Sequence, residues 1–340
     1  SMVSLNTLVA MGMVREYFLV VLASNIARIA VGIPLILIGY EGLGAAFGML
    51  LAFIVASTAS LALSVRRLGL AAPRRGDLAE ILRIGASNYP ISLSPALVSG
   101  GVVAAAILTR DPEAAGVIYI SLMISSAVGL IPSSVASVSI PAMMRGASPE
   151  LSRLGASLSA SLVLPIAVGV GISSRSILGI LGSDFSARWE ILTILSLASI
   201  PYAAIANSRS RMNWERSLAR LATMGVASLA TLATLSPILA GLAGVGGIAM
   251  AYLASSMAPL PLIRGVDIHG IIKLIAIQAI LTIALSQPPR KPLIDAALGA
   301  IGSIASIIAA HISRASRIEL LGRAIAVAIN IVRNRQTNRE

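Results

Sequence analysis

One stretch of this chain, from Leu221 to Ile263, contains no acidic or basic side chain. A helix needs about 20 apolar residues to cross the ~30 Å hydrocarbon core of a bilayer, so this stretch is long enough to cross twice. Its middle reads Gly241-Leu242-Ala243-Gly244-Val245-Gly246-Gly247, and glycine permits the backbone conformations of a tight turn. The pattern predicts two transmembrane helices joined by a hairpin, with lipid as the surrounding solvent.

The composition of the whole chain supports a membrane protein. Of 340 residues, 56% are hydrophobic and 12% are charged, and the mean hydropathy is +0.90. Soluble domains carry about 25% charged residues. Cysteine is absent, which excludes disulfides and thiolate metal sites.

Motifs of enzymes are missing from the sequence. The chain has no GxxxxGK[ST] loop for nucleotide phosphates, which disfavours an ATP-driven pump. The carboxylates also form no close cluster that would hold a metal at the membrane surface. We therefore predict no catalytic residue, no metal site and no cofactor, and an enzyme ranks behind transport and scaffold functions.

The apolar runs predict an all-α, polytopic bundle of about ten transmembrane helices. The expected spans are 17–39, 43–64, 84–108, 114–140, 154–181, 187–207, 218–240, 243–263, 269–286 and 292–312.

Loop charges give an independent test of this topology. The formal net charge is +12, and with a cytoplasmic N-terminus 20 of the 26 Lys and Arg residues fall on the inner side. Five fall on the outer side, and Arg28 remains within a span. This asymmetry follows the positive-inside rule and predicts a multi-pass protein of the cytoplasmic membrane with both termini in the cytoplasm. The inner group includes Arg83, Arg209, Arg211, Arg216 and Arg220.

A weak internal repeat links two predicted hairpins on the outer side. Gly39, Gly42 and Gly44 align with Gly241, Gly244 and Gly246 at a constant offset of 202 residues, and six spans separate the two turns. A parallel duplication of a six-helix unit would give this arrangement. The offset then places the start of the first unit before residue 1, so we expect about four spans to be missing from the front.

Short motifs spread over most of the chain resemble the polysaccharide-biosynthesis, or Wzx-type, proteins of the multidrug/oligosaccharidyl-lipid/polysaccharide (MOP) flippase superfamily. The matching segments are Tyr40–Gly48, Arg83-Ile84-Gly85, Ala115-Gly116-Val117-Ile118-Tyr119, Ile140-Pro141-Ala142, Gly182-Ser183-Asp184-Phe185, Ile191-Leu192-Thr193-Ile194-Leu195 and Gly244-Val245-Gly246-Gly247.

The resemblance implies a MATE-like architecture of two six-span lobes, usually followed by two further spans. Residues 1–75 would hold the last two spans of an incomplete first lobe, and residues 76–265 the second lobe. Residues 266–340 would hold the additional pair and a basic amphipathic tail.

The function implied by the resemblance is translocation of a lipid-linked oligosaccharide, a polysaccharide precursor, by alternating access. The implied partners are membrane lipid and a polyprenyl-linked oligosaccharide, with a second copy or a partner in place of the missing lobe. A nucleic-acid partner is not expected, because the basic residues do not form one patch interleaved with aromatic residues. Two alternatives stay open: a cation-coupled multidrug-type exporter, and a non-transporting scaffold or subunit of a glycan-assembly complex.

Arg28 is the first candidate for substrate binding. It lies near the middle of the first predicted span, where a cation costs at least ~2.5–3.5 kcal/mol on insertion scales. Such a cation should face a water-filled cavity or a partner, and the resemblance suggests that it binds the diphosphate of the lipid carrier. A bond to helix-end carbonyls or to another helix is the structural alternative.

The other candidates are polar residues at membrane depth. Asn88 and Tyr89 precede Pro90 in a span that Pro95 interrupts again, and a proline frees backbone groups that can face a cavity. Tyr119, Tyr202 and Asn207 lie within later spans. We predict that Asn88 and Tyr89 are available to sugar hydroxyls and that Tyr119, Tyr202 and Asn207 line the substrate path. A kink or a polar group used only for packing is the alternative.

Overall fold

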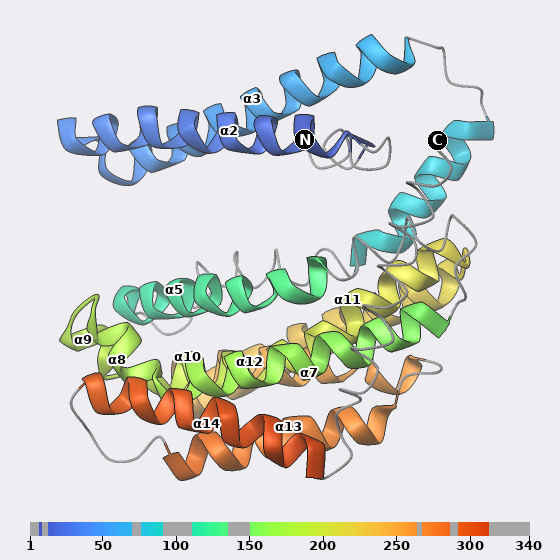
Figure 1. The fold of residues 1–340 in the computed structure, drawn as a ribbon. Coiled ribbons are helices and arrows are strands. Elements are labelled where there is room, and N and C mark those ends of the chain that lie inside the picture. Colours follow the sequence, from blue (N-terminus) through green and yellow to red (C-terminus); the bar gives the residue numbers. More distant parts are fainter. Residues whose placement is uncertain are drawn as a thin grey trace, which may run out of the picture. The chain divides into compact units, whose positions relative to one another are not determined.

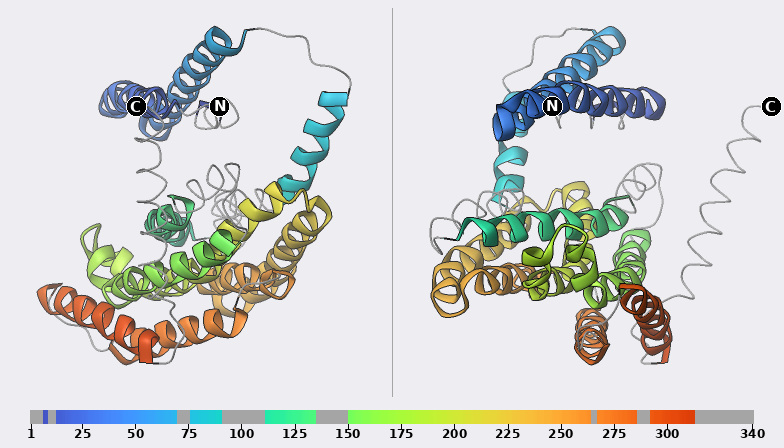
Figure 2. Two further views of the ribbon diagram at one scale, coloured as in Figure 1. Left: turned by 45° about the vertical axis from the view of Figure 1, so that its right-hand side comes forward. Right: turned by 90° about the vertical axis from the view of Figure 1, so that its left-hand side faces the viewer.

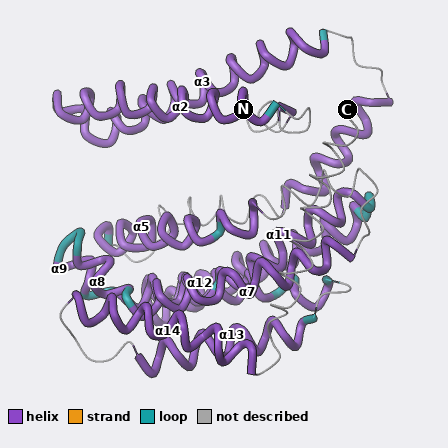
Figure 3. The backbone as a smooth tube through the Cα atoms, viewed as in Figure 1, coloured by secondary structure: helices purple, strands orange, loops and turns teal. Residues whose placement is uncertain are grey.

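The computed structural model describes residues 7–8, 13–69, 76–90, 111–134, 150–263, 267–285 and 292–312. Every regular element within these ranges is a helix (Figure 3). Five of the described helices are long and apolar enough to cross a membrane, and three shorter apolar helices accompany them. The predicted all-α, multi-pass membrane fold is therefore confirmed.

The chain divides into two compact units, Ser1–Leu78 and Ala79–Glu340. In the first unit, α2 (Val14–Leu35) continues through a π-helical segment, η1 (Ile36–Tyr40), into α3 (Glu41–Leu68). The backbone reverses at Gly39, which has a φ of 102°. The two helices then lie against each other as a hairpin (Figure 1).

Close contact between the two helices of this hairpin requires glycine. A Cβ on Gly48 would lie 2.7 Å from the carbonyl oxygen of Arg28 and 2.9 Å from the Cα of Gly32. A Cβ on Gly44 would lie 2.8 Å from the backbone nitrogen of Ile36. Small residues let the backbones of transmembrane helices approach closely. Dispersion contacts then hold the helices together, because lipid is as apolar as the side chains and provides no hydrophobic driving force.

Residues 76–90 are helical, and the second unit begins within this helix, at Ala79. Its named elements are α5 (Pro112–Val128), α7 (Glu150–Ile172), α8 (Ser174–Gly179), α9 (Ser183–Ser186), α10 (Trp189–Leu197), α11 (Ser199–Trp214), α12 (Leu218–Met257), η2 (Leu260–Leu262), α13 (Ile268–Leu285) and α14 (Pro292–Ile312).

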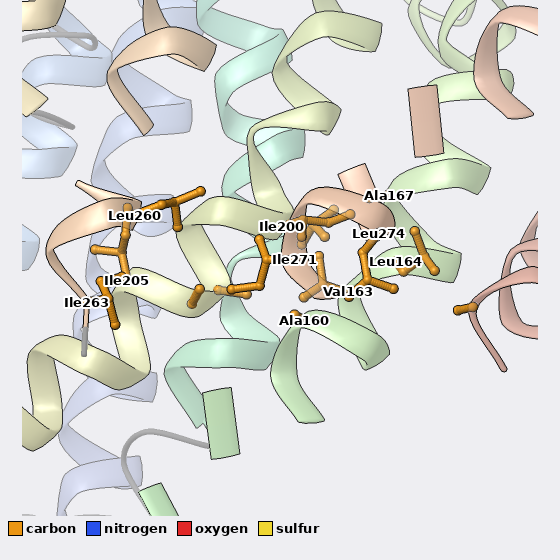
Figure 4. Packing of buried hydrophobic residues seen from close by; sticks show 14 of the residues in the cluster. Ala160, Val163, Leu164, Ala167, Ile200, Ile205, Leu260, Ile263, Ile271 and Leu274 are labelled. Atoms are coloured by element: carbon orange, nitrogen blue, oxygen red, sulfur yellow. The ribbon is translucent and has the colours of Figure 1, made fainter. Parts of the chain in front are cut away.

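Helix α7 is the centre of the second unit. Helices α10, α11, α13 and α14 all pack against it, and α13 and α14 lie side by side (Figure 2). Side chains of α7, α11, η2 and α13 interlock between these helices, as Val163, Leu164, Ile200, Leu260 and Leu274 show (Figure 4). This core is built from small and branched apolar residues, which suits helix packing inside a bilayer.

Helix α12 contains the hairpin that the sequence predicts between Leu221 and Ile263. Its backbone leaves helical geometry at Ala243 and at Gly244, where φ is 55° and ψ is −133°. The two halves run back along each other. A hydrogen bond joins them, in which the Ser228 hydroxyl donates to the carbonyl oxygen of Ser255 at 2.9 Å. Gly247 packs directly on the carbonyl group of Leu239, where a Cβ would overlap backbone atoms.

One predicted boundary is wrong. The sixth span was expected to end at Asn207, with Arg209 and Arg211 in the following inner loop, but α11 continues to Trp214. Helices α10 and α11 together form one 26-residue candidate span with a tryptophan at each end. The helix continues because a charged residue near a membrane surface can stay helical while its head group reaches outward.

The Pro95 kink, most of the third span and the basic tail lie outside the described residues.

Asp111 fixes the start of α5. Its carboxylate accepts the Ala114 backbone N–H at 3.0 Å, and the Arg188 guanidinium donates to it at 2.6 Å. The hydrogen bond from Ala114, followed by that from Arg188, holds the pKa of Asp111 below its usual value. The carboxylate therefore joins the beginning of α5 to the turn before α10.

Candidate functional site

One face of α11 carries a row of polar side chains. Tyr202, Arg209 and Asn213 follow one another at intervals of seven and four residues, which brings them to the same side of an α-helix. In the candidate span Trp189–Trp214, Tyr202 lies at the middle and Asn213 next to the end. This face therefore combines an aromatic hydroxyl, a guanidinium and an amide.

Asn88 joins this row from helical residues 76–90. Its Nδ2 donates to Asn213 Oδ1 at 2.7 Å, and Asn213 Nδ2 donates back to Asn88 Oδ1 at 3.0 Å. Arg209 Nε donates to the same Asn88 oxygen at 3.2 Å. We call these three residues the Asn88 cluster. Their side chains are half-buried, so the cluster is fixed in position without being sealed from its surroundings.

The Asn88 cluster combines one cationic group with two amides. A guanidinium is planar and suits phosphate, and amides can both donate to and accept from hydroxyl groups. The Asn88 amide oxygen also orients the Arg209 guanidinium, because it accepts the hydrogen bond from Nε. Among the described residues, no group of three or more His, Cys, Asp and Glu could hold a metal ion.

The three tyrosine candidates lie at different places in the same unit. Tyr202 packs beside the end of α5, where a Cβ on Gly129 would lie 3.1 Å from the Tyr202 ring. Tyr119 is on α5 and is 38% exposed. Tyr89 follows Asn88 directly and is 63% exposed. Of the three, Tyr202 is on the α11 face of the Asn88 cluster and Tyr89 is adjacent to it in sequence.

Asn207 faces the opposite side of α11 and is buried. Its Nδ2 donates to Ser159 Oγ of α7 at 2.9 Å and to the carbonyl oxygen of Ala203 at 3.1 Å. These bonds tie α11 to α7. A ligand would reach Asn207 only after these two helices separate. Of the predicted substrate contacts in the second unit, the one at Asn207 is therefore the least favoured by its surroundings.

Arg28 belongs to the first unit, whereas the other five candidates belong to the second. It lies midway along the candidate span Arg15–Tyr40, and its side chain is exposed on α2. The ion pairs found within the described ranges are Arg188–Asp111, Arg211–Glu215 and Arg216–Glu80, so none involves Arg28. Its role in binding stays a prediction.

Sequence reasoning missed Arg209 and Asn213 as site residues. A signal was present, because both follow Tyr202 at helical spacing. Ending the span at Asn207 assigned Arg209 to a loop and hid that spacing. The partner, Asn88, lies more than a hundred residues earlier, and only the folded unit brings it to α11.

Comparison with known proteins adds one fold likeness. No family model matches the chain, and no curated protein matches it. Among solved structures, a chain described as "Lipid II flippase MurJ, inward closed conformation" superposes with a TM-score of 0.60. This chain has a MurJ-like fold.

The likeness covers 83% of this chain and 64% of the MurJ chain, at 15% sequence identity. At that identity the similarity establishes the arrangement of helices and carries no residue roles. It agrees with the all-α bundle of a flippase-type membrane protein that the sequence motifs predict.

Proposed function

We propose that this chain is a flippase of the MOP superfamily that moves a lipid-linked precursor across the cytoplasmic membrane. The observation that carries the proposal is the MurJ-like fold over 83% of the chain, in a protein with several helices long enough to span a bilayer. The motifs that resemble Wzx-type proteins lead to the same class by a separate route. An oligosaccharide attached through a diphosphate to a polyprenyl lipid is the proposed substrate.

The Asn88 cluster is the proposed contact for the polar head of this substrate. Its guanidinium complements a phosphate. Sugar hydroxyls would bind the two amides by exchanging with the hydrogen bonds that Asn88 and Asn213 now make. The lipid tail stays in the bilayer, because apolar chains gain nothing by leaving it. Alternating access would move the head group past the cluster. Arg28, in the first unit, is proposed separately as a contact for the diphosphate.

Reconstitution into liposomes tests the function directly. The full chain would be placed in vesicles that contain a fluorescent polyprenyl-diphosphate oligosaccharide, and exposure of the sugar to an impermeant lectin would report translocation. We expect the wild-type chain to accelerate translocation over empty vesicles. A folded, reconstituted chain with no acceleration would contradict the flippase proposal, and transport of a cationic dye alone would favour the multidrug-type alternative.

Variants then test the proposed contact. Arg209→Gln removes the charge while keeping a donor, and we expect it to slow translocation roughly tenfold or more, since a lost hydrogen bond to a charged group is worth about 1.5–3 kcal/mol. Arg175→Gln, in α8, is the matched control for loss of one arginine. Equal rates for the two variants at equal thermal stability would remove the Asn88 cluster from the transport path.

A further inference from the structure

The second unit contains a cationic cleft of about 510 Å³ beside the start of α12. Two elements line it, helical residues 76–90 and the turn that leads from α11 into α12. The lining residues are Arg83, Ser87, Arg216, Ser217, Leu218, Ala219 and Arg220.

The two walls of the cleft are held together next to it. Asn88, which follows Ser87, exchanges two hydrogen bonds with Asn213 near the end of α11. Glu80 reaches across to Arg216, with Oε1 and Nη1 3.0 Å apart. The Asn88–Asn213 hydrogen bonds therefore position the two walls of the cleft, and the exposed Glu80–Arg216 pair adds little.

The described residues that line the cleft carry an excess of positive charge. Three of its lining residues are arginines, and one carboxylate, Glu80, pairs with one of them. The Arg216 and Glu80 side chains are 74% and 49% exposed, and so exposed an ion pair contributes little. An anion with more than one oxygen can replace Glu80 at small cost and gain the other two guanidinium groups.

The backbone in the cleft also favours an anion. Arg216 has a φ of 52°, a left-handed conformation that is uncommon for any residue except glycine. This turn leads into α12, and the Ser217 side chain does not cap the helix. Leu218, Ala219 and Arg220, in the first turn of α12, line the cleft at the positive end of the helix.

Apolar side chains beside the cleft indicate where the anion comes from. On the same helix as Arg83, Ile81 and Leu82 are 62% and 63% exposed. At the end of α11, Trp214 is 41% exposed, and tryptophan is enriched at membrane interfaces. The loop charges predict that this end of the helices faces the cytoplasm. A headgroup in the cleft would thus have acyl chains within reach of exposed apolar residues.

We infer that the cleft lined by Arg83, Arg216 and Arg220 binds the phosphate of an anionic lipid headgroup at the cytoplasmic face of the membrane. One guanidinium can donate two parallel hydrogen bonds to phosphate oxygens. Backbone N–H groups at the start of a helix can also donate to an anion. The inference concerns a lipid that stays in its leaflet, and it does not depend on the proposed transport activity. Its chemistry is shared with soluble phosphates, so the source has to be tested.

The first experiment measures lipid retention on the purified full chain by native mass spectrometry, with phosphatidylglycerol or phosphatidylcholine in mixed micelles. The test variant is Arg83→Gln/Arg216→Gly/Arg220→Gln. The control, Arg66→Gln/Arg67→Gln/Arg175→Gln, removes the same charge elsewhere. A basic residue at a membrane surface changes anionic-lipid affinity by roughly 5-fold, so the test variant should lose on the order of 100-fold in phosphatidylglycerol affinity. The control removes three charges that do not share one cleft, so it should lose clearly less affinity than the test variant.

A second arm uses inorganic pyrophosphate in detergent without added anionic lipid. Cleft-dependent phosphatidylglycerol binding supports the inference as stated, with or without pyrophosphate binding. Binding of pyrophosphate alone would keep the phosphate site and overturn its lipid source. If the test and control variants bind both probes equally, the cleft is not a phosphate site.

Arg216→Gly alone separates binding from folding. Glycine adopts a φ of 52° without strain, so the thermal midpoint should stay level or rise while phosphatidylglycerol affinity falls. Unchanged affinity in this variant would remove Arg216 from the site. Translocation is measured with the same protein. Loss of phosphatidylglycerol binding with normal translocation, or the reverse, would show that the lipid site and the flippase activity are independent.

Discussion

The chain forms two glycine-turned hairpins, α2/α3 in the first unit and the two halves of α12 in the second. Each reverses near a glycine with positive φ, Gly39 and Gly244. Each then brings its helices together on a glycine without space for a Cβ, Gly48 and Gly247. The same local chemistry serves both turns.

Burial separates the two hairpins. In the most apolar windows of α2 and α3, 11% and 17% of residues are buried, against 33% in α12. The α12 hairpin also has a buried hydrogen bond, from Ser228 to Ser255, and packs against other helices of its unit. The α2/α3 hairpin carries the exposed Arg28 at its middle.

The difference teaches that a turn sequence specifies a hairpin and not its surroundings. In lipid, an exposed apolar face costs nothing, so α2 and α3 are stable with few neighbours. A midplane arginine on such a hairpin does carry a cost, and the predicted role of Arg28 in binding stays to be tested.

The largest effect should come from Gly247→Ala in the buried hairpin. The new Cβ would overlap the Leu239 carbonyl group, and backbone atoms cannot move aside as a flexible side chain can. We expect a loss at or above about 3 kcal/mol, the upper range for overpacking. The neighbouring Gly246→Ala, with nothing within 4 Å, is the control. Thermal midpoints of the two purified variants measure the difference, and equal midpoints would contradict the close contact.

Replacing Arg28 should act in the opposite direction. Arg28→Ala removes a midplane charge worth ~2.5–3.5 kcal/mol on insertion scales, so membrane insertion should stay level or improve. Translocation per folded molecule should be lost, and Arg28→Lys should keep part of it because the charge persists. Arg15→Ala, at the end of the same span, is the control. Full translocation by Arg28→Ala would exclude Arg28 from binding.

Gly48→Ala should disturb the exposed hairpin less than Gly247→Ala disturbs the buried one. The new Cβ would meet the Arg28 carbonyl oxygen at 2.7 Å, but within the described part of the first unit α2 and α3 pack mainly on each other and can separate slightly. The expected cost is about 1–3 kcal/mol. Cysteine pairs across α2 and α3, in a chain that lacks native cysteine, would report the wider spacing by slower crosslinking. Crosslinking at the wild-type rate would show that the hairpins do not differ in this way.

The smallest effect should come from Ser228→Ala. It removes one interhelical hydrogen bond, and such bonds average about 0.6 kcal/mol in membrane proteins. Thr234→Ala, which loses only bonds within its own helix, should cost less. Denaturant midpoints of both variants test the ranking, and a larger loss for Thr234→Ala would reverse it.

Much of the fold follows from the sequence alone. Apolar runs, the glycines of Gly241–Gly247 and the distribution of arginines predict an all-α membrane protein, and the helices match most of the expected spans. These features are local in sequence, because a bilayer requires each spanning segment to satisfy its own backbone hydrogen bonds. The motifs that resemble flippases point to the class of fold that the structural likeness supports.

The tertiary structure decided which polar groups meet. Asn88, Tyr202 and Asn207 were all predicted as site residues, but folding puts Asn88 beside Arg209 and turns Asn207 away toward Ser159. It also brings Arg83 beside Arg216 and Arg220 in one cleft. The sequence determined that these segments are helices in a membrane, because helix formation depends on nearby residues. Which helix faces which depends on packing between segments distant in the chain, and no single segment encodes that choice.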